Sequence, residues 1–224
     1  MLSVFLSVCS LIVVGLTNAA PVRNSSLAAE TQFPYTTSLQ LNGTHVCGAA
    51  IIAPELMLTA ASCVTSNNTL VTLPVGNLSV RAGSLQHASG GVVSQITRVI
   101  VHEDYAGEES NDLAMLKLAE PLLYSPSIAP IAITNVDITA NTTLTISGWV
   151  NATSLHWDTG LGHAHEHSKT IIYLDSSGRA GEPGAPAVWQ QKLLGIGSRH
   201  SDAYANIYYH REWIYRNARA AMFT

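Results

Sequence analysis

The character of the apolar runs is the feature that most constrains the fold of this chain. The runs are short, rich in β-branched residues, and separated by clusters of glycine, asparagine, proline and serine. Such runs, bounded by turn-forming residues, are typical of the strands of an all-β protein. We expect strands at residues 35–41, 46–53, 56–60, 78–82, 92–101, 114–118, 143–149, 170–174, 192–196 and 203–208.

The C-terminal segment 211–222 follows a different pattern. Ile214, Ala218, Ala221 and Met222 recur at helical spacing in a stretch rich in alanine and arginine, which predicts a helix. With 224 residues, 47% of them hydrophobic, the chain can form one compact unit or two small barrels that share a core. The net charge is −4 and no basic run occurs, so the sequence gives no indication of a nucleic-acid partner.

The first 20 residues form an apolar run that ends in small residues, Thr17-Asn18-Ala19-Ala20. This pattern predicts a secretory signal peptide at 1–20 and a mature chain of 21–224. The alternative is an uncleaved membrane anchor, but the run is short and is interrupted by serines. We therefore expect a secreted, extracellular protein with no membrane association after cleavage.

Cysteines and glycosylation sequons agree with secretion. Removal of the signal peptide takes Cys9 with it and leaves Cys47 and Cys63, which allow one disulfide in an oxidising compartment. Asn-x-Ser/Thr sequons are expected glycan sites on surface loops. They occur at Asn24, Asn42, Asn67, Asn77, Asn141 and Asn151.

Five motifs occur in an order that resembles the trypsin-like (chymotrypsin-fold) serine proteases. They are Leu58-Thr59-Ala60-Ala61-Ser62-Cys63, Asn111-Asp112-Leu113-Ala114-Met115-Leu116-Lys117-Leu118, Ile146-Ser147-Gly148-Trp149, Gly181-Glu182-Pro183-Gly184-Ala185-Pro186 and Gly195-Ile196-Gly197-Ser198. The resemblance runs from about Phe33 to the end. It implies two six-stranded Greek-key β-barrels at about 33–120 and 131–210, a C-terminal helix at 211–222, and a Cys47–Cys63 disulfide.

The resemblance also assigns catalytic positions, and two of the three hold unexpected residues. Asp112 matches the carboxylate that orients the catalytic imidazole, but Ser62 stands at the histidine position and Pro183 at the serine position. A serine hydroxyl does not accept a proton near neutral pH, and proline has neither a hydroxyl nor an N–H. Gly181 would then supply the remaining oxyanion-hole donor. On these grounds we expect that the protein is not an enzyme but a pseudoprotease.

Such a chain resembles the secreted pseudoproteases of arthropods. The resemblance implies that the protein acts by binding other proteins, as a cofactor, decoy or regulator of extracellular proteolysis. It also implies that immune or reproductive secretions are where such a protein would act. The partner would be a protease, a protease inhibitor or a receptor, and no cofactor is expected. The alternative is a residual serine endopeptidase; Asp175-Ser176-Ser177-Gly178 superficially resembles a serine site, but it lies upstream of the expected position.

A histidine-rich segment gives a further alternative, a metal-binding module. His163, His165 and His167 alternate along the chain, and residues two apart share one face of a strand. Such a pair can supply two ligands to Zn²⁺ or Cu²⁺. The simpler interpretation is a solvent-exposed loop, and we expect no metal site here.

Overall fold

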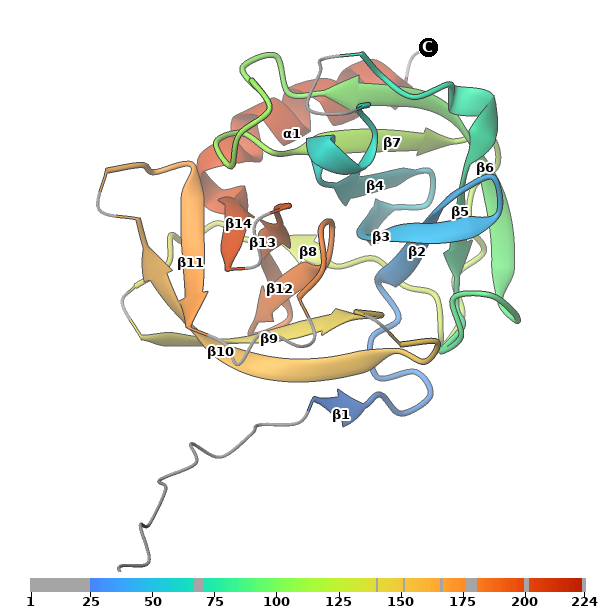
Figure 1. Cartoon of the computed structure of the whole chain (residues 1–224), viewed down its shortest axis with the longest axis horizontal. Coiled ribbons are helices and arrows are strands. Elements are labelled where there is room, and N and C mark those ends of the chain that lie inside the picture. Colours follow the sequence, from blue (N-terminus) through green and yellow to red (C-terminus); the bar gives the residue numbers. More distant parts are fainter. Residues whose placement is uncertain are drawn as a thin grey trace, which may run out of the picture.

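Two closed six-stranded antiparallel β-barrels, followed by a C-terminal helix, make up the fold (Figure 1). The computed structural model describes residues 25–66, 71–139, 141–150, 152–165, 167–175, 181–199 and 202–222. The all-β, trypsin-like architecture expected from the sequence is confirmed. Within these residues, no helix has both the length and the apolar character needed to cross a membrane.

The first barrel is built from the strands β2 to β7. In chain order they are β2 (Thr36–Leu41), β3 (Thr44–Ala53), β4 (Leu56–Thr59), β5 (Leu78–Ala82), β6 (Val92–Val101) and β7 (Ala114–Leu118). The spatial order is β2-β3-β4-β7-β6-β5, and pairing of β5 with β2 closes the barrel. Asn42 and Gly43 connect β2 to β3 with φ values of 52° and 78°, as a tight hairpin turn requires.

The second barrel contains six further strands. They are β9 (Thr142–Gly148), β10 (His156–Ala164), β11 (Ile171–Asp175), β12 (Pro186–Trp189), β13 (Lys192–Gly197) and β14 (Ala203–Asn206). The spatial order is β9-β10-β11-β14-β13-β12, and β12 pairs with β9 to close it. Two short strands are added at the rim: β1 (Ser26–Leu27) pairs with β10, and β8 (Ala132–Ile133) pairs with β13.

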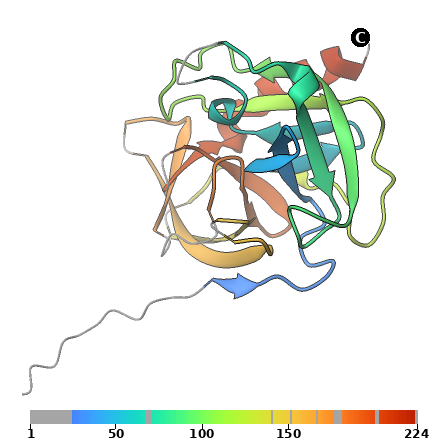
Figure 2. The same cartoon turned by 45° about the vertical axis from the view of Figure 1, so that its right-hand side comes forward.

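An apolar cluster joins the two barrels and the C-terminal helix. Leu58 and Met115 from the first barrel, Ile196 from the second, and Trp213 and Ile214 from the helix are all buried in it. The helix α1 (Ile207–Met222) contacts strands of both barrels, including β7 and β13. Figure 2 shows the two barrels side by side with β1 below them. The barrels are therefore held in one relative position by burial of shared apolar surface.

Two strands of the second barrel were missed by the sequence analysis, namely the nine-residue β10 and the four-residue β12. Strand β10 contains Gly160 and Gly162, and glycine is depleted in strands. A Cβ on Gly162 would lie 2.3 Å from a side-chain atom of Ile138, so the glycine allows close packing there. The glycine that weakens the strand pattern of β10 is thus required by close packing against Ile138.

The start of α1 also differs from the expectation. The helix begins at Ile207, whereas the sequence pattern indicated a start near residue 211 and a strand through residue 208. The Asn206 side-chain oxygen accepts hydrogen bonds from the N–H groups of Tyr208 and Tyr209, at 3.1 Å and 3.4 Å. Asparagine therefore acts as an N-cap and ends the strand.

Candidate functional site at the junction of the barrels

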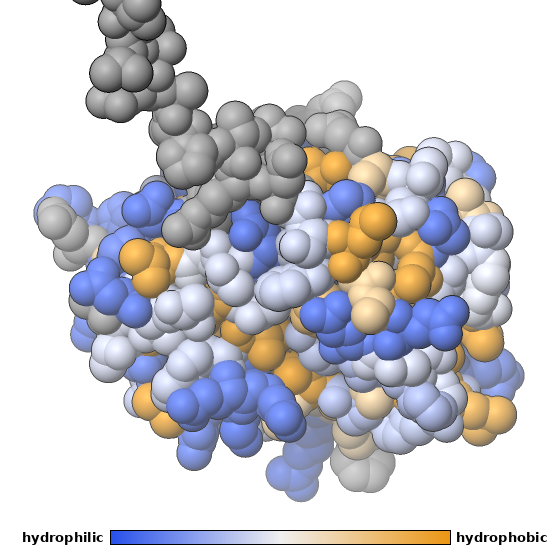
Figure 3. All heavy atoms as spheres, turned by 90° about the horizontal axis from the view of Figure 1, so that it is seen from below, coloured by the Kyte–Doolittle hydropathy of each residue, from blue (hydrophilic) through white to orange (hydrophobic). Residues whose placement is uncertain are grey.

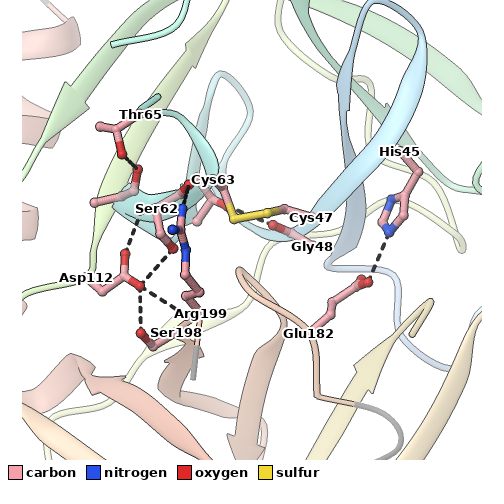
Figure 4. The surroundings of a disulfide bond; sticks show 12 residues. His45, Cys47, Gly48, Ser62, Cys63, Thr65, Asp112, Glu182, Ser198 and Arg199 are labelled. Atoms are coloured by element: carbon pink, nitrogen blue, oxygen red, sulfur yellow. Dashed lines mark hydrogen bonds and ion pairs between the residues drawn. A yellow bond between two sulfur atoms is a disulfide. The ribbon is translucent and has the colours of Figure 1, made fainter. Parts of the chain in front are cut away.

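A buried carboxylate, that of Asp112, lies where loops of both barrels meet (Figure 4). Its Oδ1 accepts a hydrogen bond from the Ser62 N–H at 2.7 Å. Its Oδ2 accepts three more, from Ser62 Oγ at 2.8 Å, Ser198 Oγ at 2.6 Å and the Arg199 N–H at 3.2 Å. Asp112 is only 1% exposed, so these four donors replace the water that a charged carboxylate would otherwise bind.

Local backbone structure places each member of this cluster. Ser62 lies in the short 3-10 helix η1 (Ala61–Cys63), which follows β4, and Asp112 precedes β7. Asn111 takes a φ of 59°, which asparagine tolerates better than most residues, and turns the chain so that Asp112 points inward. Ser198 and Arg199 follow β13 of the second barrel. Residues of both barrels therefore donate hydrogen bonds to the same carboxylate, that of Asp112.

Arg199 reaches across the junction from the second barrel to the first. Its Nη2 donates to the Ser62 carbonyl oxygen at 3.3 Å, while the residue as a whole stays exposed. Figure 4 shows the side chain extending toward Ser62 beside the disulfide. The positive charge of Arg199 therefore lies on the solvent side of the site, whereas Asp112 is buried.

The electrostatic effect of Asp112 is also visible on Tyr105, which is buried nearby. Burial raises the pKa of the Tyr105 hydroxyl, and the negative charge of Asp112 raises it further. The Arg199 charge and a hydrogen bond with Thr65 act in the opposite direction. Tyr105 is thus a neutral hydrogen-bonding group at any physiological pH.

The loop that carries Pro183 packs closely against the first barrel. The Gly48 N–H donates to the Pro183 carbonyl oxygen at 2.9 Å, and the Gly184 N–H donates to Gly197 at 2.7 Å. Gly184 has a φ of 81°, and a Cβ there would lie 1.9 Å from the Gly48 oxygen. Only glycine fits that approach. Gly181 is similarly confined, because a Cβ on it would lie 2.3 Å from the Tyr204 hydroxyl.

A second polar series, which the sequence analysis did not identify, joins Ser38, His45 and Glu182. His45 Nδ1 hydrogen-bonds to Ser38 Oγ at 2.9 Å, and His45 Nε2 to Glu182 Oε2 at 3.0 Å. The other oxygen of Glu182 accepts from the Trp149 N–H at 3.0 Å. Ser38 is 0% exposed, so in this conformation its hydroxyl faces the protein interior and cannot meet a substrate. The series links β2 and β3 of the first barrel to the Glu182 loop.

The histidine at position 87 extends this series toward the surface. Its ring stacks on that of His45, with centroids 5.0 Å apart and planes 29° apart. Burial lowers the pKa of His87, and the neighbouring His45 lowers it further. The nearby Glu182 carboxylate acts in the opposite direction. For this series, the only signal in the sequence was the position of His45, two residues before Cys47.

Other expected sites lie away from this junction. The Cys47–Cys63 disulfide is present, which confirms the expected bond, and it holds η1 against β3. The side chains of Asn42, Asn77 and Asn141 are exposed, whereas Asn24, Asn67 and Asn151 lie outside the described residues, as does the expected signal peptide at 1–20. Glycosylation at the six sequons stays a prediction.

The histidine-rich segment forms the end of the β10–β11 hairpin. His163 lies on β10 opposite Tyr173, and the Nδ1 of His165 accepts from the His167 N–H at 3.0 Å. His165 therefore already uses one ring nitrogen within the hairpin. In the described part of the chain, no group of three or more acidic, histidine or cysteine side chains is arranged to hold a metal ion.

The hydropathy of the surface gives no single dominant patch on the face that carries β1. On this face, drawn in Figure 3, hydrophobic side chains form several separate groups among hydrophilic ones. Small separate groups are ordinary for a protein surface. The visible part of this face therefore offers no single hydrophobic surface as a candidate site.

Comparison with known proteins gives consistent matches over most of the chain. Residues 22–209 match the protein-family model described as Trypsin. The chain is 31% identical over 229 residues to "Serine protease SP24D" of Anopheles gambiae, covering 89% of this chain and 82% of that protein. It is 29% identical over 220 residues to "Trypsin alpha" of Drosophila erecta and of Drosophila melanogaster, covering 84% of each chain.

These matches correct one expectation from the sequence. The substitutions at Ser62 and Pro183 led us to expect that the protein is not an enzyme. That expectation is contradicted, because the matching family and the similar proteins bear the names of trypsins and of a serine protease. Three positions carried that expectation, whereas the family match covers residues 22–209.

Proposed function

The chain belongs to the trypsin family, and from that premise we propose that it is a secreted protein of extracellular proteolysis that binds another protein. In this role it is a cofactor, decoy or regulator, and its partner is a protease, a protease inhibitor or a receptor. Cleavage of residues 1–20 and glycosylation at the exposed sequons belong to the same proposal. Immune and reproductive secretions are settings in which such a protein would act.

The hydrogen bonding of Asp112 is the observation that carries the proposal. We assign Ser62, Asp112 and Pro183 to the three catalytic positions of the family, and Gly181 to the remaining oxyanion-hole donor. Within the described residues, hydroxyl and amide groups of Ser62, Ser198 and Arg199 surround the carboxylate. Asp112 in this arrangement anchors η1 of the first barrel and the segment after β13, and the latter presents Arg199 at the surface.

Arg199 gives the junction its recognition chemistry. A guanidinium offers several N–H donors in a fixed plane and binds carboxylates or backbone carbonyl oxygens of a partner well. The residue is exposed, its Nη2 donates to the Ser62 carbonyl oxygen at 3.3 Å, and its backbone N–H donates to Asp112 at 3.2 Å. A charged group on a rigid base loses little conformational entropy when a partner binds. The partner surface we propose therefore carries acceptor groups that face Arg199.

Protein hydrolysis is the second candidate function, and the names of the relatives favour it. Three proteins similar to this chain are named as trypsins or a serine protease. A hydrolytic site in this chain would need a nucleophile other than residue 183, because proline has no hydroxyl. The hydroxyls nearest to Asp112 are those of Ser62 and Ser198.

One set of experiments separates the two candidates. Wild-type protein, Arg199→Ala and the control Arg98→Ala are immobilised and exposed to the native secretion, and retained proteins are identified. Arg98 is an exposed arginine on β6, so its replacement matches the charge change away from the junction. Binding at the junction predicts a partner retained by wild type and Arg98→Ala but at least about tenfold less by Arg199→Ala.

The same proteins are tested for casein cleavage and for labelling by a fluorophosphonate. Equal retention by all three proteins would refute binding through Arg199. Labelling with casein cleavage, abolished by Ser62→Ala or Ser198→Ala, would establish hydrolysis as the function. These two readouts are independent, so each candidate can fail without the other.

A further inference from the structure

A pair of buried imidazole rings connects the C-terminal helix to the first barrel. His102 follows β6 and His210 lies in the first turns of α1, and their ring centroids are 4.9 Å apart with planes at 73°. The exposed fractions are 8% for His102 and 2% for His210. His102 also stacks on Trp213 of α1, with centroids 5.0 Å apart and planes at 25°. Two titratable rings from different elements thus pack against each other in the interior.

The ring nitrogens have no favourable place for an additional proton. His102 Nδ1 accepts a hydrogen bond from the Asp104 N–H at 3.2 Å, so a proton there would face another donor. His210 Nε2 is buried and has no hydrogen-bond partner among the described residues. A proton on that nitrogen would become a buried N–H without an acceptor. Both rings are therefore suited to the neutral state.

The surrounding charges act in both directions on the pair. Burial is the largest cause that lowers the pKa of each ring, and contact with His102 lowers that of His210 further. Glu103 and Asp104, beside His102 in sequence, favour its charged form, while Arg216 on α1 opposes it. A hydrogen bond between the His210 ring and the Thr170 backbone favours charge on His210. Burial prevails, and the pKa of His210 is lowered to about 4.

We propose that the His102–His210 pair is an acid-sensitive latch, which holds α1 on the first barrel when both rings are neutral and releases it on protonation. Protonation of either ring would place a charge in an apolar region, and protonation of both would add repulsion across the contact. The remaining links between α1 and the first barrel include Lys117 Nζ, which donates to the Ala221 carbonyl at 2.6 Å. Glu103 bonds to Trp213 Nε1 at 2.6 Å and pairs with Arg216.

The direction of the effect follows from the two states. His210 binds a proton near its ordinary pKa of 6.5 when the chain is unfolded, but only near 4 in the folded protein. The unfolded state therefore takes up more protons between these values, and stability falls as the pH drops through this range. From about pH 7.5 to about pH 5, His210 alone should raise the unfolding equilibrium constant about 30-fold.

The test compares the pH dependence of stability in matched variants. Urea unfolding of wild type, His210→Phe and the control His167→Phe is measured at about pH 7.5 and about pH 5. His167 is an exposed histidine, so its replacement removes one imidazole without touching the pair. The latch predicts that His210→Phe removes about 30-fold of the acid-induced change and that His167→Phe keeps it. Equal pH dependence in all three proteins would overturn the proposal.

Two measurements on the wild-type protein keep the test decisive if His210→Phe does not fold. Nuclear magnetic resonance of the histidine rings should show one that titrates below about pH 5, and its absence would contradict the burial argument. Hydrogen exchange, corrected for the intrinsic pH dependence, should show amides of α1 losing protection at about pH 5 before those of β2 and β3. Unchanged protection of α1 would refute its release.

Discussion

Replacement of Asp112 tests whether the junction of the barrels depends on one carboxylate. In Asp112→Ala, four donors lose their acceptor: two from Ser62, one from Ser198 and one from Arg199. The two serine hydroxyls can rotate toward other acceptors, whereas the two backbone N–H groups cannot. A buried donor left without a partner costs about 1–3 kcal/mol, so we expect a loss of about 3–5 kcal/mol in unfolding free energy.

The conservative variant Asp112→Asn allows a finer prediction. Its amide has one oxygen and one NH₂ group, and the backbone donors of Ser62 and Arg199 lie on different carboxylate oxygens. Either orientation of the amide therefore opposes its NH₂ to one backbone N–H. We expect an intermediate loss of about 1–3 kcal/mol.

Urea denaturation at neutral pH, followed by tryptophan fluorescence, measures both losses. Asp202→Asn is the matched control, because this aspartate is exposed and its replacement should change the unfolding free energy by less than about 0.5 kcal/mol. The reasoning would be wrong if Asp112→Asn were as stable as the control. It would also be wrong if Asp112→Ala were no less stable than Asp112→Asn.

Three further predictions concern the neighbourhood of this site. Joint replacement of Cys47 and Cys63 by alanine should lower the unfolding free energy by about 3 kcal/mol, because the disulfide joins two residues that are 16 positions apart in the chain. Urea denaturation measures this loss. Gly184→Ala should lower the melting temperature strongly, since its Cβ would lie 1.9 Å from Gly48, whereas Gly76→Ala meets open space and should leave it nearly unchanged. Glu182→Ala should cost about 1–3 kcal/mol by the same denaturation assay, because Glu182 is nearly buried and accepts from two groups; a cost below about 0.5 kcal/mol would contradict that role.

The sequence predicted the fold well because strands leave a local signature. Short β-branched runs separated by turn formers gave the barrel strands of the first unit, and the order of five motifs gave the architecture. Strand β10 was missed because two glycines weaken its local pattern, although close packing against Ile138 requires at least one of them. The start of α1 was displaced because Asn206 acts as a cap, which only the hydrogen bonds reveal.

Less of the candidate site could be predicted from the sequence, because its contacts join residues that are far apart in the chain. The motifs assigned Asp112 and Ser62 to two catalytic positions, but the contribution of Arg199 depends on how the second barrel packs against the first. The same holds for His45 and Glu182, which are separated by 137 positions and meet only in the folded protein. Sequence spacing carries no information about such contacts unless a family motif records them.

The junction makes function and stability hard to separate in this protein. Asp112 joins Ser62 of the first barrel to Ser198 and Arg199 of the second, and the His45–Glu182 contact joins the same two units. A variant in either cluster that loses partner binding or hydrolysis could do so because the barrels shift. Arg199→Ala is the informative change, since it keeps the backbone N–H that donates to Asp112 and removes the guanidinium together with its hydrogen bond to the Ser62 carbonyl oxygen. An effect of that variant on function, with unfolding free energy unchanged, would therefore locate the activity at the surface of the junction.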